Sequence, residues 1–259
     1  MMDTSSFTGH PLSESLPLVS GFPWKLIALF FSCNLFTSIL GPWLMVNRQP
    51  LDLKPFLLIY NGLVFGANVV GVFLDLWVTD WARVSFDCSP IDQQLTDLKP
   101  FFTVYLAYIF LWLHIGEMLP RVVTILMKKT LKWDKLDMVD EFIFVFTIFY
   151  GLKYFPGKSS SFLTLVTLIF GIVDYSMRVC ASAGPPIVNV NHWRSLFTIL
   201  KSLQSIAILI HGLIMLTNPS CSNIANLSLL EITSSFLSFI NIYRNWSADW
   251  TKTKCPKDD

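Results

Sequence analysis

The chain has 259 residues and a formal net charge of +1, and 53% of its residues are hydrophobic while only 14% are charged. A soluble globular chain carries roughly 25% charged residues, so this composition excludes an ordinary soluble domain and indicates a polytopic membrane protein. The balanced charge and the lack of a long basic run give no reason to expect a nucleic-acid partner.

Seven apolar stretches are long enough, or nearly so, to cross a bilayer, which takes ~20 mostly apolar residues. We expect an all-α membrane protein with a lumenal N-terminal segment 1–25, a seven-helix domain 26–246 and a cytosolic tail 247–259. The acidic, polar N-terminus has no positive n-region, so we expect no cleaved signal peptide. The expected spans are residues 26–46, 56–78, 101–127, 136–155, 162–183, 196–216 and 224–246.

The Lys and Arg residues of the loops predict the orientation of these spans. Eleven of them lie in or beside the first, third and fifth loops and the tail, against three in the second and fourth loops. The positive-inside rule therefore places the C-terminus in the cytosol and the N-terminus in the lumen. Cys88 and Cys221 then share the oxidising lumen, where they form either a disulfide or two free thiols. No Cys/His spacing suits a zinc site, so we expect no metal there.

Ionisable residues gather at membrane depth around the third loop. His114, Glu117 and Arg121 recur at i, i+3 and i+7, so they share one helical face. A second group, the carboxylates at 137, 140 and 141, shares a face of the next helix. Ionisable groups inside spanning helices are costly and usually face a cavity or a partner. The sequence therefore predicts that a functional site is built here.

Several short motifs occur in an order that resembles the very-long-chain fatty acid elongases, the membrane 3-oxoacyl-CoA synthases. The resemblance covers the chain from about Gly41 to Tyr243. Each motif is weak alone, and their shared order carries the similarity. The motifs are Gly41-Pro42-Trp43, Asn47-Arg48-Gln49-Pro50, Pro55-Phe56 with Tyr60-Asn61, Phe86-Asp87-Cys88-Ser89-Pro90, Met127-Lys128-Lys129, Pro156-Gly157-Lys158, Gly184-Pro185 and the run Trp193, Thr198, Gln204.

The resemblance implies a fold and a reaction. Six helices would form an inverted-repeat barrel around an acyl tunnel with a cytosolic mouth, and the extra helix would lie outside. The family condenses malonyl-CoA with a long-chain acyl-CoA in the endoplasmic reticulum membrane, without a bound cofactor, and members could pair as homo- or hetero-dimers. Substrate-binding positions implied here are Lys128, Lys129 and Lys132 near the CoA phosphates, and Tyr175.

The same alignment shows departures at the catalytic positions. The family's His-x-x-His-His box falls on Asp137, Asp140 and Glu141. Of the Lys-x-x-Glu-x-x-Asp-Thr motif only Glu117 remains, and His114 replaces its lysine. Of the paired glutamines only Gln204 remains. Cations have appeared at nominally neutral positions, and we expect an ion-pair network that includes Arg121, Asp174, Arg178 and Lys201.

Neutral imidazole is nucleophilic near pH 7, whereas a carboxylate is a poor acyl acceptor and cannot donate a hydrogen bond to an enolate. We therefore expect an elongase homologue that binds acyl-CoA and whose condensation activity is impaired or lost. The carboxylates at 137, 140 and 141 have two other interpretations, a divalent-metal site or an acidic helix start.

Two other functions remain open. One is a working elongase that uses acid and base groups other than histidine, with malonyl-CoA and acyl-CoA as substrates. The other is a seven-helix receptor or transporter. Against a receptor, the third stretch ends in Met127-Lys128-Lys129 without an Asp-Arg-Tyr motif. Against a transporter, the charges gather at one end of the bundle rather than along a path.

Overall fold

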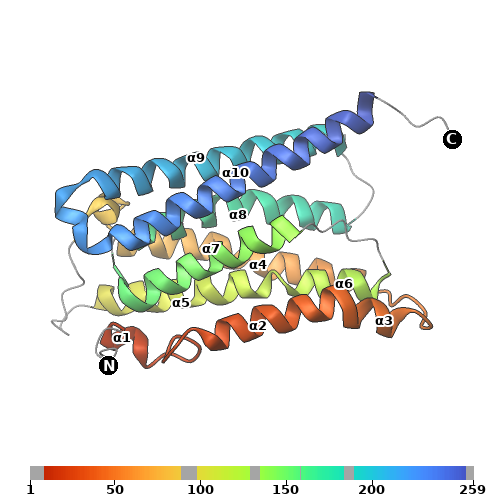
Figure 1. The fold of residues 1–259 in the computed structure, drawn as a ribbon, viewed down its shortest axis with the longest axis horizontal. Helices are drawn as coiled ribbons and strands as arrows, with labels where there is room; N and C mark the ends of the chain where they lie inside the picture. The colour runs from red at the N-terminus through yellow and green to blue at the C-terminus, as the bar shows by residue number, and fades with distance from the viewer. Residues whose placement is uncertain (1–8, 89–97, 129–134, 158, 184–189, 255–259) are drawn as a thin grey trace.

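A computed structural model describes residues 9–88, 98–128, 135–157, 159–183 and 190–254. These residues form helices and connecting turns with no strand. In Figure 1 the long helices run roughly side by side along one bundle. The elements are α1 (Pro11–Glu14), α2 (Trp24–Leu35), a π-helical turn (Phe36–Leu40), α3 (Gly41–Met45), α4 (Lys54–Val78), a 3-10 turn (Arg83–Phe86), α5 (Leu98–Gly116), α6 (Leu119–Leu126), α7 (Lys135–Tyr154), α8 (Ser160–Ala183), α9 (Val190–Thr217), a second 3-10 turn (Pro219–Ile224) and α10 (Ala225–Lys254).

Six segments of the described chain are long and apolar enough to cross a membrane, so the chain is an all-α, multi-pass membrane protein. They coincide with six of the seven expected spans to within a few residues. The expected fourth span corresponds to α7, which carries Asp137, Asp140, Glu141 and Lys153 and is therefore more highly charged than the six apolar segments. The six segments are Trp24–Met45, Lys54–Val78, Leu98–Leu126, Ser160–Ser182, Ser195–Thr217 and Pro219–Trp246.

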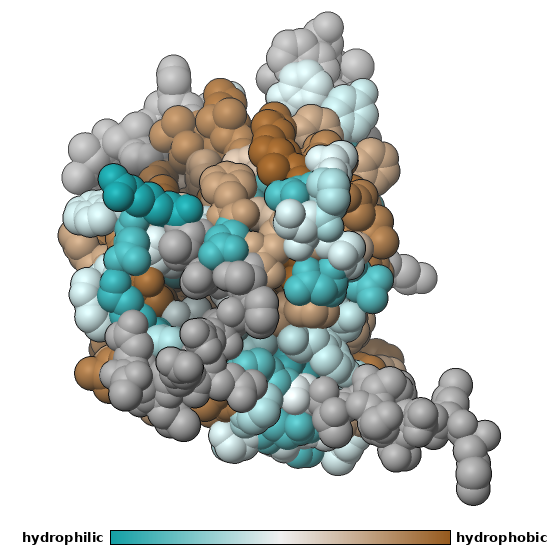
Figure 2. All heavy atoms as spheres, turned by 90° about the vertical axis from the view of Figure 1, so that its left-hand side faces the viewer, coloured by the Kyte–Doolittle hydropathy of each residue, from teal (hydrophilic) through white to brown (hydrophobic). Residues whose placement is uncertain are grey.

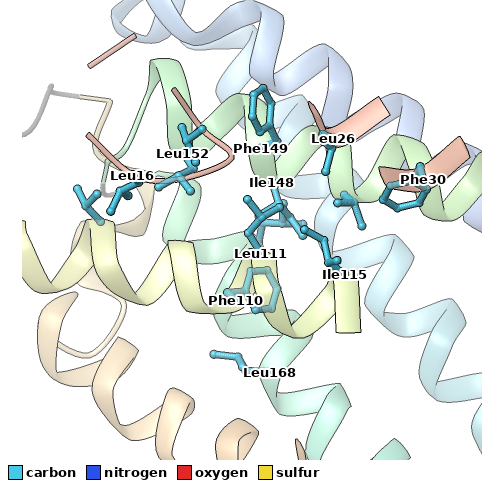
Figure 3. Close-up of a cluster of buried hydrophobic side chains, with 14 of the residues drawn as sticks. Leu16, Leu26, Phe30, Phe110, Leu111, Ile115, Ile148, Phe149, Leu152 and Leu168 are labelled. Carbon is cyan, nitrogen blue, oxygen red and sulfur yellow. The ribbon is translucent and has the colours of Figure 1, made fainter. Parts of the chain in front are cut away.

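Helix packing brings distant parts of the chain together. α4 lies along α8, α9 lies along α10, and α10 also packs on α7. An apolar cluster joins α2, α5 and α7, as Figure 3 shows. Phe110 and Leu111 of α5 meet Phe149 of α7, and all three are at most 2% exposed. α2 adds Leu26 and Phe30 to this cluster from the edge of the bundle.

The segment before the first span docks on the C-terminal end of α7. The His10 backbone N–H donates to the Lys153 carbonyl at 2.8 Å, and the Ser13 hydroxyl donates to the same carbonyl at 3.1 Å. The Lys153 ammonium in turn donates to the Gly21 carbonyl. Leu16 and Val19 are buried in the apolar cluster. Residues 1–25 were expected only to form a lumenal N-terminal segment, and the described part of this segment is integrated into the core.

The same end of the bundle holds the turn between α9 and α10, and Figure 2 looks onto it, with hydrophilic residues across its middle and hydrophobic ones on its flanks. A disulfide joins Cys88 to Cys221 with a Cα–Cα distance of 5.2 Å, so of the two possibilities left open above the structure has the bonded one. Beside it, His211 lies 3.0 Å from Glu231 and stacks on Phe162 at 4.3 Å between ring centroids. These contacts tie the chain between α4 and α5 to α8, α9 and α10.

Candidate functional site

A cavity of about 470 Å³ lies inside the bundle and is lined by α4, α5, α6, α7, α8, α9 and α10. α2 and α3 contribute nothing to its wall. One part of the wall is apolar, with Val64, Phe110, Leu113, Phe144 and Ile208. The other part is charged, and its ionisable residues are His114, Glu117, Arg121, Asp137, Asp140, Glu141, Asp174, Arg178 and Lys201.

A break between α5 and α6 brings the first group of ionisable residues to the cavity. Pro120 has no backbone N–H and its ring clashes with the carbonyl four residues earlier, so the α-helix cannot continue unbroken. The N–H groups of Glu117 and Met118 instead donate to carbonyls three residues back, each at 3.2 Å. Across this tightened turn His114, Glu117 and Arg121 all line the cavity, as their shared helical face predicted.

The three carboxylates of α7 also line the cavity rather than the outer surface, and each contacts a group on another helix. Glu141 contacts the guanidinium of Arg121. Asp140 accepts hydrogen bonds from the Ser238 hydroxyl at 2.6 Å and the Asn241 amide at 3.3 Å. The Asp137 carboxylate lies 3.9 Å from the Arg244 guanidinium. The expected ion pairs across the cavity thus occur at Arg121, whereas the partners on α10 were not foreseen.

The metal interpretation of this trio has no support in the described residues, where no group of three or more His, Cys, Asp or Glu side chains is arranged to hold a metal ion. The helix-start interpretation is compatible with the structure, because Asp137 lies in the first turn of α7 and an acidic residue there interacts favourably with the helix dipole. Asp137 also lines the cavity, so its place at the start of α7 is compatible with a place in the cavity wall.

α8 and α9 complete the charged wall. Asp174 and Arg178 form a two-point contact within α8, with N···O distances of 3.2 and 2.8 Å, and the guanidinium lies 4.9 Å from the ring centroid of Tyr175. Lys201 differs from the arginines, because no carboxylate of the described chain lies within ion-pair distance of its ammonium. Gln204, one turn away, donates to Thr167 at 3.3 Å while its side-chain oxygen has no partner in the described chain.

The formal charge of the wall is negative when His114 is neutral. Its lining residues include five carboxylates but only three permanent cations, which are Arg121, Arg178 and Lys201. Arg244, which contacts Asp137 from outside the lining, does not reverse the sign. Away from Lys201, a negatively charged ligand group therefore meets more anions than cations in the described wall, an imbalance that a neutral polar group does not feel.

His114 is the only imidazole among the described lining residues. Its Nδ1 lies 3.2 Å from Oε1 of Glu117. Phe110 and Phe144 meet the imidazole edge to face, at 4.5 and 5.0 Å between ring centroids. The carboxylate and the two rings together restrict the orientation of the imidazole.

The expected substrate-binding residues differ in where they lie. Tyr175 lines the cavity and is 2% exposed. Lys128 is exposed, does not line the cavity, and donates to the Val46 carbonyl at 3.2 Å. Lys129 and Lys132 fall outside the described residues. Their expected role at the CoA phosphates stays a prediction.

Sequence reasoning missed the polar face of α10. Ser234, Ser238, Asn241 and Asn245 recur at helical spacing along the cavity wall. The i, i+4, i+7, i+11 spacing of these residues can be read from the sequence. It was overlooked because the segment was considered only as an apolar membrane span. Two of these residues hold Asp140, so α10 supplies neutral hydrogen-bond partners for a cavity carboxylate.

Gly171 also lines the cavity, and the space beside it is filled by a side chain of another helix. A Cβ added at Gly171 would lie 2.5 Å from the side-chain oxygen of Asn68. The amide of Asn68, buried at 6% exposure, donates to the Val64 carbonyl at 2.7 Å. An asparagine from α4 therefore occupies the space beside Gly171.

Comparisons with known proteins agree with this architecture. The chain is 26% identical over 211 residues to the very long chain fatty acid elongase AAEL008004 of Aedes aegypti, covering 79% of this chain and 57% of that protein. It is 22% identical over 225 residues to elongase 7 of Drosophila melanogaster (86% and 66%), and 24% identical over 251 residues to elongase 1 of Mus musculus (94% and 87%). The chain thus spans less than two thirds of the length of the two insect relatives.

A family model described as ELO: GNS1/SUR4 family matches residues 21–254, which include every long helix described above. The chain therefore belongs to the ELO (GNS1/SUR4) family, and its relatives in this family carry the name very long chain fatty acid elongases.

Proposed function

We propose that this protein binds long-chain acyl-CoA with the acyl chain in the α4–α10 cavity and does not condense it with malonyl-CoA. Family membership supports an elongase-like function and weighs against the receptor and the transporter. The proposal rests on where the α7 carboxylates lie and on what they contact. They line the cavity where relatives are expected to keep imidazoles, and each contacts another helix.

The acyl-acceptor chemistry of the family fails at these positions. An acylated carboxylate would be a mixed anhydride, which is a far more reactive species than an acyl-imidazole and a poor store for the acyl group. Glu141 is moreover engaged by Arg121, and Asp140 accepts two hydrogen bonds. Neither carboxylate is therefore arranged as a free nucleophile.

The charge of the wall opposes the second substrate of condensation. Malonyl-CoA must bring its own carboxylate next to the reacting carbonyl. Five carboxylates against three permanent cations make this end of the cavity repulsive for that group. The thioester of an acyl-CoA is neutral and meets no such barrier.

The shape of the cavity suits an alkyl chain. On α8 the lining runs from Thr167 to Arg178, which corresponds to a length of ~17 Å along a helix. The apolar part of the wall, with Phe110, Phe144 and Ile208, offers a surface for the chain. We place the thioester at the charged end and the phosphates of CoA outside it, on the lysine-rich side.

The proposal includes a membrane arrangement. α7 would be the seventh span, its charges stabilised inside the bundle, and the lysine-rich third loop would face the cytosol of an endoplasmic reticulum membrane. The helices that line the cavity are α4, α5 with α6, α7, α8, α9 and α10. They support a ring of six spans, with α7 included and α2 outside the ring. Exposed hydrophobic residues on α2, α4 and α9 support contact with lipid.

Photocrosslinking tests the binding. A long-chain acyl-CoA with a diazirine near its methyl end is added to the purified full chain in liposomes, and the adducts are mapped by mass spectrometry. We expect adducts on peptides of α5, α8 and α9 that unlabelled stearoyl-CoA displaces. Adducts confined to α2 and α3, or resistant to competition, would refute the proposed binding site.

Restoring histidines tests the loss of condensation. The variant Asp137→His/Asp140→His/Glu141→His removes three negative charges and supplies the family's box. We expect at most partial recovery of 3-oxoacyl-CoA formation in microsomes, because Arg121 then loses its contact with Glu141. Production of 3-oxoacyl-CoA by the unaltered protein at a rate at or above that of the restored variant would contradict the proposal.

A further inference from the structure

We propose that the cavity hydrolyses the thioester of a bound long-chain acyl-CoA, with His114 as the general base and Glu117 as the residue that positions it. The inference rests on the proposed acyl-CoA binding and adds an activity to it. Water replaces malonyl-CoA as the second reactant, and the products are a free fatty acid and CoA.

The cavity contains a group suited to proton transfer near neutral pH. His114 is the only imidazole among the described lining residues, and imidazole is the side chain best suited to proton transfer near neutral pH. Its Nδ1 lies 3.2 Å from Glu117, so the carboxylate favours the tautomer with the proton on Nδ1. Nε2 is then the basic nitrogen. Catalytic hydrogen bonds are often long in ligand-free structures and tighten around the substrate.

The charge of the cavity wall discriminates between malonyl-CoA and water as the second reactant. A wall with more carboxylates than cations repels the malonyl group but admits water. It also disfavours retention of the fatty acid product, which is an anion once ionised. The net charge of the wall therefore opposes condensation and favours product release, whereas the oxyanion of hydrolysis depends on a nearby cation.

One cation of the cavity has no carboxylate partner within the described chain. Lys201 lines the same cavity as His114, and its ammonium lies 5.7 Å from the ring centroid of Phe197 but contacts no carboxylate of the described chain at ion-pair distance. An ammonium without a carboxylate partner can stabilise the negative charge that develops on a carbonyl oxygen during attack. Arg121 and Arg178 are engaged by Glu141 and Asp174, so Lys201 is the cation available for this role.

Hydrolysis of the thioester changes no oxidation state, so it needs no oxidant or reductant. Nε2 of His114 takes a proton from water while the water oxygen bonds to the thioester carbon, and the carbonyl oxygen becomes an oxyanion beside Lys201. Collapse of this intermediate breaks the C–S bond, and the proton on Nε2 passes to the sulfur of the leaving CoA. The acid product then ionises.

The test uses the purified full chain in liposomes with stearoyl-CoA in ¹⁸O-labelled water and no malonyl-CoA. CoA release is followed with a thiol reagent, and the ¹⁸O content of the fatty acid is measured by mass spectrometry. We expect release of CoA above the protein-free rate and one ¹⁸O atom in each fatty acid. His114→Gln should lower the rate about 100-fold or more, the contribution typical of a general base, while stearoyl-CoA binding is retained.

The positioning role of Glu117 is tested by measuring kcat and KM separately in its variants. Glu117→Gln should lower kcat with little change in KM, because the base is misoriented while binding is intact, and Glu117→Asp should recover part of kcat. His10→Gln, at a histidine outside the cavity, is the matched control and should leave the rate unchanged. Retention of the Cys88–Cys221 disulfide and a monodisperse elution profile verify that each variant is folded.

Three outcomes would overturn the inference. Stearoyl-CoA binding without CoA release above background refutes hydrolysis and leaves the proposed binding function standing. Equal release by the parent and by His114→Gln assigns any hydrolysis to another group. Absence of both binding and release refutes the hydrolysis and the binding function together.

Discussion

Arg121 and Glu141 come from different helices, α6 and α7, and meet inside the cavity. Their side chains are 20% and 14% exposed, so each charge is largely removed from water. Removing one partner of a largely buried pair leaves the other charge uncompensated. The contact therefore contributes to the tolerance of both charges inside the bundle.

Charge reversal tests this contribution. Arg121→Glu should destabilise the protein by about 2 kcal/mol, less than the ~3–5 kcal/mol for a fully buried pair. Glu141→Arg should do the same, and the double reversal should regain a large part of the loss. Thermal unfolding in detergent measures the three variants. Additive losses in the double variant would show that the two residues do not act on each other.

Gly171 carries a second prediction at this scale. Its Cβ position is blocked by the side chain of Asn68, which lies 2.5 Å away. Gly171→Ala should destabilise the protein by about 1–3 kcal/mol through overpacking. In the background of Asn68→Ala the same substitution should cost much less, because the obstacle is gone. An equal cost in both backgrounds, measured by thermal unfolding, would mean that Asn68 is not what excludes the methyl group.

Individual helices were largely predictable from the sequence, because a membrane span needs about 20 apolar residues whatever its neighbours are. The break after Gly116 was not predicted, although Pro120 was visible, because a proline kink inside a span can be repaired by neighbouring helices. Likewise, the docking of the N-terminal segment onto α7 depends on Ser13 and Lys153, which are far apart in sequence. No local pattern encodes such a contact.

The docked N-terminal segment should respond to pH through His10. Nδ1 of His10 accepts a hydrogen bond from the Leu12 N–H at 3.4 Å, which requires an unprotonated nitrogen. Partial burial lowers the pKa of His10 below its ordinary value. The docked state therefore favours neutral His10, so its stability is greatest above the ordinary pKa of about 6.5 and is lost as the pH falls through the lowered pKa.

Hydrogen exchange measures this effect. After correction for intrinsic rates, amides of residues 9–23 should exchange faster at pH 5.5 than at pH 7.5, with no such change in α4. His10→Asn keeps a side chain that can cap α1 but does not titrate in this range. Exchange in that variant should be independent of pH, and an unchanged pH response would remove His10 as its source.

At the scale of the whole molecule, the charged end of the cavity and the disulfide lie at different places in the bundle. The carboxylates of α7 gather near its start, whereas Cys88 and Cys221 lie by the turn between α9 and α10. The sequence placed both groups on helices and loops correctly. It could not supply the partners of Asp137 and Asp140 on α10, because the register between two packed helices is set by tertiary contacts and not by either helix alone.

The disulfide closes a long loop and should stabilise the entire bundle. Cys88 and Cys221 are separated by 133 residues, and a cross-link of this kind typically contributes about 3 kcal/mol. Cys88→Ser/Cys221→Ser should therefore unfold at a lower temperature than the parent, and reductant should destabilise the parent only. A non-reducing peptide map of protein made in the secretory pathway that shows two free thiols would contradict the bond.

We propose that the scaffold has kept a cavity for acyl-CoA and has lost condensation. The most direct test is transfer of labelled carbon from malonyl-CoA to stearoyl-CoA by the unaltered protein, in microsomes from cells that lack other elongases. We predict no 3-oxoacyl-CoA above the level of vector-only microsomes, while photocrosslinking in the same membranes reports bound acyl-CoA. Sustained formation of labelled 3-oxoacyl-CoA would contradict the proposed loss of condensation.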